Sequence, residues 1–231
     1  MWTDLLVLIG IFTASIASSM YRTVCKMAAA PEPKLQPDLD AEIMARLPRD
    51  VAAFLQANGF QFAGAYGFHA VRFGIWTAPA GTPIERRLCF SLTAKGSNCE
   101  WVTEFSDDAS LTTTRTRSAF IFPRIFGEFL QSFPNASIEQ LWDSHVRGEQ
   151  FLVLERAIPV RACRVPYTER LRRSMTRQLS YVRSLPLWPL RGVYWFLVKR
   201  FLMHNRPVWR QDLSGLYARL PGTVPARGVS V

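Results

Sequence analysis

The sequence predicts an α+β fold in which an antiparallel meander of five to six strands is covered by helices. Three observations lead to this prediction. Segments of alternating apolar and polar residues occupy the middle of the chain, turn-forming residues separate them, and segments with helical spacing lie on both sides. Short links between consecutive strands favour antiparallel pairing, because a parallel pair needs a long crossover connection.

The chain has 231 residues and is expected to contain four parts. These are an amino-terminal transmembrane anchor (1–26), a proline-rich spacer (27–37), an α+β domain (38–158) and a basic, aromatic, helical carboxy-terminal region (159–231). Because 48% of the residues are hydrophobic, the chain has enough apolar material for a packed core. This composition excludes a wholly disordered protein.

The amino-terminal segment is predicted to be a single transmembrane helix. Residues 5–21 form a run of 17 residues without a charged side chain, which is the lower limit for crossing a bilayer. A signal peptide cleaved after residues 15–17 is the alternative, but positive charge follows the apolar run, at Arg22 and Lys26, and does not precede it. By the positive-inside rule this order favours an uncleaved, single-pass anchor with the folded domain on the cytoplasmic side.

Small residues recur every four positions within this segment, at Gly10, Ala14 and Ser18. Such a ridge lets two membrane helices approach closely, so these residues are candidates for transmembrane packing. Chance recurrence in a segment rich in alanine and serine is the alternative explanation.

An extended spacer and a helix lead into the central domain. Proline resists helix formation, and the spacer contains Pro31, Pro33 and Pro37. Asp38 or Asp40 can cap a following helix that ends at 58–59, and Pro48 is expected to kink or divide it. Its apolar residues have helical spacing: Ile43, Leu47, Val51, Phe54 and Leu55.

From Phe60 onward the apolar period changes from about 3.6 residues to 2, the period of a strand with one buried face. Turn-rich segments at 78–81, 95–98 and 106–109 separate the alternating stretches. The expected strands are 60–68, 71–75, 88–92, 101–105, 111–117 and 129–133.

The apolar face of this sheet requires a cover, and the next segment predicts one. Ser137 and Gln140 have the spacing of a capping box at the start of a helix, which Gly148 would end. One side of this helix carries Ile138, Leu141, Trp142, His145 and Val146.

Motifs that would name a reaction are absent from the sequence. HExxH, paired CxxC, GxxxxGK[ST], GxGxxG after a strand and GxSxG do not occur. Among the histidines, His145 is expected to be hydrogen-bonded and not catalytic, because Asp143 lies two positions away and points elsewhere on the helix. The sequence therefore predicts no catalytic residue, no metal site and no cofactor.

The four cysteines do not have the spacing of a metal site; they are Cys25, Cys89, Cys99 and Cys163. If the hairpin turn centres on Gly96, Cys89 lies opposite about Thr103. Cys89 and Cys99 would then be too far apart for a disulfide.

Thr113, Arg115 and Arg117 form a candidate anion site within the unusual stretch 111–117. Threonine hydroxyl and arginine guanidinium groups both donate hydrogen bonds to anions. A solvated edge strand, whose charges discourage pairing with another sheet, is the alternative.

The net charge of +10 resides entirely in the last third of the chain. Residues 1–158 carry 14 basic and 16 acidic side chains, or −2, whereas residues 159–231 carry 14 basic and 2 acidic side chains, or +12. Two amphipathic helices are expected here, one from Thr168 and one from Leu190 to His204. Such a charge favours a partner that carries phosphate.

This basic region is predicted to lie on a membrane surface. Its longest uncharged run, 192–198, has only 7 residues and cannot span a bilayer. Trp and Tyr prefer the headgroup zone, and Arg and Lys reach anionic phosphate from there. Packing of the helices on the sheet is the alternative. The expected membrane-surface residues are Arg173, Arg177, Trp188, Arg191, Tyr194, Trp195, Lys199, Arg200, Phe201 and Trp209.

Together these features predict a membrane-tethered, non-enzymatic binding or scaffolding domain. Its partners would be a bilayer with anionic lipids and a protein of unspecified kind. One alternative is a basic nucleic-acid- or ribosome-associated protein, against which the apolar amino terminus argues. The other is a small-molecule enzyme whose scattered residues would include His69, Cys89 or Arg115.

Overall fold

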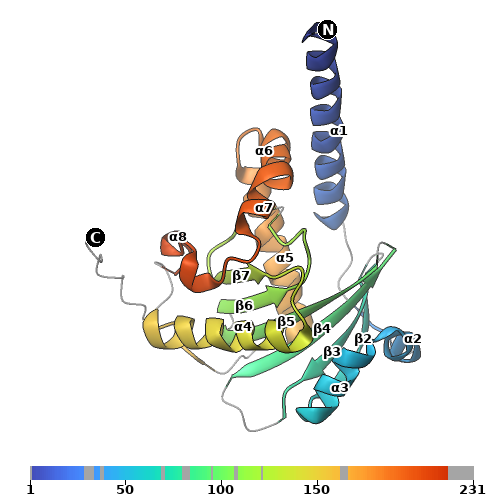
Figure 1. The fold of residues 1–231 in the computed structure, drawn as a ribbon, viewed down its shortest axis with the longest axis vertical. Helices are drawn as coiled ribbons and strands as arrows, with labels where there is room; N and C mark the ends of the chain where they lie inside the picture. Colours follow the sequence, from blue (N-terminus) through green and yellow to red (C-terminus); the bar gives the residue numbers. More distant parts are fainter. Residues whose placement is uncertain are drawn as a thin grey trace.

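The structure, a computed structural model, describes residues 2–28, 34–36, 39–68, 71–79, 84–94, 96–106, 109–120, 122–161 and 166–217. In these residues a mixed sheet carries helices on both of its faces (Figure 1). The predicted α+β class is therefore confirmed. Several residues singled out in the sequence lie outside the described part of the chain: Pro31, Pro33, Pro37, His69 and Cys163.

Seven strands form the sheet, and their spatial order is their order along the chain. They are Lys34–Leu35 (β1), Gln61–Phe68 (β2), Val71–Thr77 (β3), Glu85–Thr93 (β4), Gly96–Ser106 (β5), Ala109–Thr114 (β6) and Glu128–Ser132 (β7). Every neighbouring pair is antiparallel except β6 and β7, which are parallel. The predicted antiparallel meander is confirmed from β2 to β6. The prediction that the whole sheet is antiparallel was wrong, because β7 pairs parallel to β6 after the connection 115–127.

The β4–β5 hairpin has a register that the sequence analysis did not predict. Thr93 pairs with Gly96 and Cys89 with Glu100, so the turn lies nearer to β4 than a centre at Gly96 would place it. Cys99 precedes Glu100 and therefore points to the opposite face of the sheet from Cys89. Cys89 and Cys99 are both free, as expected, but the reason is the alternation of the strand and not a long separation.

Three helices cover one face of the sheet (Figure 1): Asp40–Arg46 (α2), Arg49–Ala57 (α3) and Ile138–Gln150 (α4). Pro48 divides α2 from α3, because proline is tolerated at a helix start but not in its interior. Asp40 does not cap α2; its Oδ1 accepts a hydrogen bond from the Ala65 amide at 3.0 Å and ties the helix to β2.

The capping box predicted for α4 is present. The Ser137 hydroxyl accepts from the Gln140 amide at 3.2 Å, and the Gln140 side chain accepts from the Ser137 amide at 2.9 Å. Gly148 does not end the helix, which continues as a π-helix, Phe151–Glu155 (η2). A Cβ at Gly148 would lie 3.0–3.2 Å from side chains of Gln131, Leu111 and Val208, so glycine allows close packing here.

Between these helices and the sheet lies an aromatic core centred on Trp101, which is fully buried. Ring centroids of Phe54, Phe60 and Trp142 lie 5.7, 5.1 and 4.6 Å from that of Trp101. Aromatic rings at these separations and tilted orientations attract each other beyond their apolar burial.

The carboxy-terminal region is built into the same fold. Tyr167–Ser184 (α5) lies against the opposite face of β5, β6 and β7 from α4 (Figure 1). After it come Val208–Arg210 (η4) and Ser214–Tyr217 (α8). Val208 and Leu216 from these segments are buried in a core cluster with Phe105 and Leu111 of the sheet.

A second helical group lies beyond the sheet (Figure 1). It comprises Trp2–Ala28 (α1), Trp188–Tyr194 (α6), Trp195–Lys199 (η3, a π-helix) and Arg200–Met203 (α7). Val24 of α1 and Trp195 of η3 are buried with Leu179 and Val182 at the end of α5. The other half of α1 projects away from the rest of the chain (Figure 1).

The expected amino-terminal helix is thus present as a helix. Within the residues that the structure describes, however, none of the helices has both the length and the apolar character needed to cross a membrane.

Candidate functional site

Exposed apolar side chains gather on the second helical group. Of the 18 large hydrophobic side chains that are exposed in the described residues, seven lie on α1 and seven within 187–202. Those of α1 are Leu5, Val7, Leu8, Ile9, Ile11, Phe12 and Tyr21. Those of the second segment are Leu187, Leu190, Tyr194, Leu197, Val198, Phe201 and Leu202. We call these fourteen side chains the apolar surface.

The two halves of the apolar surface are held together by contact between α1 and α6. A Cβ at Gly192 would lie 3.2 Å from the side chain of Met20, so the helices cross closely at this glycine. Tyr21 also stacks on Trp188, with ring centroids 5.7 Å apart. Val193 and Trp195 are buried, which shows that one side of the 188–203 helix packs inward while its other side stays bare.

That bare side is the apolar arc of the amphipathic helix predicted from Leu190 to His204. It consists of Leu190, Tyr194, Leu197, Val198 and Phe201, which are 37–55% exposed. An arc of this kind normally packs against the rest of a protein, because leaving it in water forgoes the free energy of apolar burial. An exposed apolar arc of this kind therefore indicates a binding surface.

Positive charge accompanies the apolar surface, and the one acidic residue in the sequence of either segment is Asp4, near the start of α1. No Asp or Glu occurs in 5–31 or in 170–211. Arg22 and Arg191 are exposed, and the Arg200 guanidinium lies 4.0 and 4.5 Å from the ring centroids of Phe196 and Phe201. Burial, with a smaller effect from Arg124, lowers the pKa of Lys199.

The expected membrane-surface residues separate into distinct groups. Tyr194, Phe201 and Arg191 are exposed on the second helical group, and Lys199 and Arg200 are partly buried there. Trp188 is also partly buried, in the stack with Tyr21. These residues remain candidates for membrane contact.

Other expected surface residues are placed elsewhere. Trp195 is only 6% exposed and belongs to the core that joins α1 to α5. Trp209 packs on the sheet core, with the Arg147 guanidinium 5.1 Å from its ring centroid. Arg173 and Arg177 lie on α5, over the sheet. Trp195 is therefore buried away from any membrane surface, whereas Trp209 is only partly buried and its contact with a membrane stays a prediction.

The small-residue ridge on α1 is exposed. Gly10, Ala14 and Ser18 all face solvent, and a Cβ at Gly10 would meet nothing within 4 Å. Their role in helix packing stays a prediction.

Of the candidate anion site at 113–117, Thr113 cannot contribute. The Thr113 hydroxyl is buried and engaged by His145 and Gln131, so it is not available to an anion. Arg117 is exposed, and its carbonyl oxygen is paired with the His204 side chain at 3.0 Å. Arg115 is partly buried, and its Nε has no hydrogen-bond partner among the described residues, so a role of the two arginines in anion binding stays a prediction.

His145 belongs to a buried hydrogen-bond chain between α4 and the sheet. Its Nδ1 lies 2.7 Å from the Thr113 hydroxyl and its Nε2 lies 2.8 Å from the Thr103 hydroxyl. The Thr113 hydroxyl accepts a hydrogen bond from the side-chain amide of Gln131 at 2.8 Å and donates its own hydrogen bond to Nδ1 of His145. The Thr103 hydroxyl donates a hydrogen bond to Glu149 at 3.0 Å, so it accepts a hydrogen bond from the N–H group at Nε2.

This chain of hydrogen bonds fixes His145 in one neutral tautomer, and it ends on the ion pair between Glu149 and Arg86. Glu149 accepts from Arg86 Nε at 2.8 Å. Burial, and secondarily the positive charge of Arg86, lowers the pKa of His145 to about 3. A fully bonded, neutral histidine is a structural group, because both ring nitrogens are occupied and no substrate proton can reach them.

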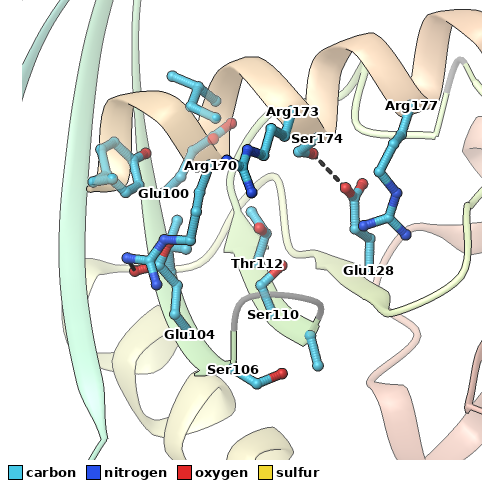
Figure 2. Close-up of a pocket in the computed structure, with 14 residues that line it drawn as sticks. Glu100, Glu104, Ser106, Ser110, Thr112, Glu128, Arg170, Arg173, Ser174 and Arg177 are labelled. Atoms are coloured by element: carbon cyan, nitrogen blue, oxygen red, sulfur yellow. Dashed lines mark hydrogen bonds and ion pairs between the residues drawn. The ribbon is translucent and has the colours of Figure 1, made fainter. Parts of the chain in front are cut away.

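A cleft lies on the other face of the sheet, between α5 and strands β5, β6 and β7 (Figure 2). Its volume is about 140 Å³. Residues 167–177 of α5 form its roof, and alternate residues of the strands, which point away from α4, form its floor and sides. The charged groups that line it are Glu100, Glu104, Glu128, Arg170, Arg173 and Arg177.

Each carboxyl group of the cleft has at least one partner within the protein. Glu104 forms ion pairs with both Arg87 and Arg170. Burial raises the pKa of Glu128, against the opposing effect of the hydrogen bond from Ser174. Burial likewise raises the pKa of Glu100.

Behind the cleft, Cys89 and Tyr167 form a hydrogen-bonded pair that burial keeps protonated. Desolvation is the largest cause that raises the pKa of Cys89, and it also raises the pKa of Tyr167 well above its ordinary value. A cysteine of this kind is a poor nucleophile, because the thiolate is the reactive form.

The sequence did not predict the cleft or most of the buried hydrogen bonds around His145. A signal was nevertheless present on β5, where Glu100 and Glu104 alternate with Trp101 and Thr103. Two charged residues on one face of a strand whose other face is apolar predict a polar environment on that side. One partner of Glu104, Arg170, comes from α5, 66 residues further along the chain, which no local pattern reveals.

No family profile, no curated protein and no solved structure matches this chain.

Proposed function

We propose that this protein is a membrane-attached, non-enzymatic binding or scaffolding protein whose apolar surface enters an anionic bilayer. The observation that carries the proposal is the exposed arc of the 188–203 helix beside the exposed half of α1. The helices that carry these two faces contact each other at Gly192 and Met20, so we expect both faces to meet one lipid surface.

The energetics favour a bilayer as the occupant. Each half-exposed Leu, Ile or Phe gains about 1 kcal/mol when it leaves water, and ten of the fourteen side chains of the apolar surface are of these types. Each Lys or Arg near an anionic leaflet contributes about 1 kcal/mol more. The absence of Asp and Glu from 170–211 removes the repulsion that anionic lipids would otherwise exert on this segment.

The orientation follows from the same surface. If the apolar surface lies in the membrane, the sheet and its helices α2, α3 and α4 stand away from it (Figure 1). Arg22 and Lys26 follow the apolar part of α1 and prefer the cytoplasmic side, where anionic lipids are enriched. The sheet would then be presented to cytoplasmic partners.

The test is flotation of the full chain with phospholipid vesicles, with and without phosphatidylserine. We expect binding that is stronger with phosphatidylserine and weaker at high salt. The double variant Ile11→Glu with Phe201→Glu should bind about tenfold more weakly or worse, because each substitution places a charge on the apolar surface.

The matched control is Leu154→Glu. Leu154 is 79% exposed on η2, outside the apolar surface, so its substitution adds one charge to the protein without touching the proposed contact. Leu154→Glu should bind as the wild type does. A wild-type chain that does not float, or a double variant that floats equally well, would contradict the proposal. Salt-sensitive RNA binding without flotation would favour a nucleic-acid-binding protein.

A further inference from the structure

The guanidinium group of Arg200 is held by two aromatic rings at the margin of the apolar surface. It lies 4.0 Å from the ring centroid of Phe196 and 4.5 Å from that of Phe201. Phe201 belongs to the apolar surface and is 55% exposed. Aromatic faces attract a cation, most strongly where water is partly excluded, so the two rings position the guanidinium group.

The terminal nitrogens of this guanidinium group are available to a ligand. Among the described residues, no carboxylate or carbonyl group pairs with Arg200, and of its side-chain nitrogens only Nε is fully enclosed. Nη1 and Nη2 therefore keep access to the surface near Phe201. Two free nitrogens on one planar fork can bind two oxygen atoms of one phosphate group.

The fold brings two further cations to this place. Phe122 packs against the buried cluster that contains Trp195, so the connection before β7 lies against η3. Arg124 follows Phe122 by two positions, and Lys199 follows Trp195 by four and directly precedes Arg200. Burial, and then the charge of Arg124, lowers the pKa of Lys199, which agrees with this placement.

The described residues offer little negative charge to these three cations. Neither Asp nor Glu occurs in 170–211, and Lys199 forms no ion pair in the described part of the chain. The charge of Asp212 acts on Arg124, but Oδ1 of Asp212 already accepts from the amide and hydroxyl groups of Ser214, at 3.0 and 2.8 Å. Cations that are partly buried side by side favour an anion from outside the chain.

We infer that Arg200, Lys199 and Arg124 bind the headgroup phosphate of an anionic lipid, and that they prefer a phosphomonoester headgroup, as in phosphatidic acid. A phosphomonoester carries about −1.5 to −2 charges near neutral pH and three acceptor oxygens, which suits three cations. The phosphodiester of phosphatidylserine carries a single charge. This inference rests on the proposed membrane attachment and names the lipid that the apolar surface would meet.

The lipid is favoured over a soluble phosphate compound because of what surrounds the site. Arg200 contacts Phe201, so the acyl chains of a lipid bound here would continue onto the apolar surface. A soluble phosphate compound would leave this apolar contact unused.

The experiment is flotation of the full chain with two kinds of vesicle, one containing phosphatidic acid and the other phosphatidylserine, at matched surface potential. Matching the potential cancels the general attraction between a positive protein and an anionic surface. We expect about tenfold tighter binding to phosphatidic acid, because its phosphate accepts more charge-assisted hydrogen bonds. The ratio of the two affinities is the preference that the variants are compared by.

Variants then locate the site. Arg200→Gln removes the guanidinium group and should reduce the preference to near equality. Arg200→Lys keeps the charge without the planar fork and should also lose most of the preference. Arg191→Gln is the matched control, because Arg191 is an exposed arginine of the same helical segment outside the cluster. It should weaken binding to both vesicles alike and leave the preference within about twofold of the wild type.

Glycerol 3-phosphate distinguishes the two sources of phosphate. It carries the same phosphomonoester without acyl chains, so it should displace the chain from vesicles at least about a hundredfold less effectively than short-chain phosphatidic acid. Equal displacement by the two compounds would assign the site to a soluble phosphate compound and overturn the inference.

Two further results would overturn it. One is equal affinity of the wild type for the two vesicles, which would leave membrane attachment standing. The other is an equal loss of preference in Arg191→Gln and Arg200→Gln, since this pattern indicates diffuse positive charge. Failure to float with either vesicle would contradict membrane attachment itself, so the two failures are distinguishable.

Discussion

Single residues of the sheet show how polar groups have different environments on its two faces. Thr103 and Thr113 face α4, where His145 consumes their hydrogen bonds. Thr112, the neighbour of Thr113, faces α5 and keeps its hydroxyl toward the cleft. Alternation along one strand thus gives adjacent threonines different environments.

The pKa of His145 leads to a prediction about stability and pH. The unfolded chain has a histidine pKa near 6.5, whereas burial lowers it to about 3 in the folded protein. Between these values the unfolded state binds more protons, so the free energy of unfolding falls as pH falls, by at most about 1.4 kcal/mol per pH unit.

The variant His145→Gln provides the comparison. It lacks the titrating ring and should be about 2 kcal/mol less stable at neutral pH, because the buried threonines lose partners. As pH falls toward about 4, the wild type should lose this advantage, which urea unfolding at several pH values measures. Parallel stability curves for the two proteins would show that His145 does not titrate as proposed.

At the scale of elements, the close crossing of α1 and α6 depends on a glycine. Gly192 lies against Met20, and a leucine there would push the helices apart. We expect Gly192→Leu to release α1, so that trypsin cleaves after the exposed Arg22 at least about fivefold faster.

Gly10→Leu is the control for this substitution. It introduces the same side chain into a helix, but a Cβ at Gly10 meets nothing within 4 Å, so the cleavage rate should stay that of the wild type. Equal cleavage rates for Gly192→Leu and the wild type would mean that α1 does not pack on α6 in solution.

Most elements could be predicted because their signals are local. The strands from β2 to β6 have an alternating pattern and turn residues between them, and the capping box marks the start of α4. The parallel pairing of β7 with β6 could not be predicted, because the connecting residues 115–127 have no periodic pattern. The β4–β5 register was missed because it depends on one position of the turn.

The site residues were harder to predict for the same reason. Arg170 meets Glu104 across 66 positions of the chain, and the cleft exists only once α5 lies on the sheet. The exposed arc on the 188–203 helix could be predicted, since helical spacing alone defines it. Its position beside α1 depends on the tertiary structure.

At the scale of the whole molecule, the positive charge of the carboxy-terminal region serves two purposes. Arg170 is consumed inside the fold by Glu104, whereas Arg191 stays exposed beside the apolar arc. The net charge of the region therefore overstates the charge available to a membrane. Apolar contact, more than charge, has to supply the attachment.

The most direct test of membrane attachment through the apolar surface is cross-linking of the full chain to vesicles that contain a photoactivatable lipid. The labelled peptides are then mapped by mass spectrometry. If the apolar surface enters the bilayer, lipid adducts should form on α1 and on 187–202. None should form on η2, although Leu154 is at least as exposed as the side chains of the apolar surface. Adducts spread evenly over the protein, or found on η2 and absent from 187–202, would contradict it.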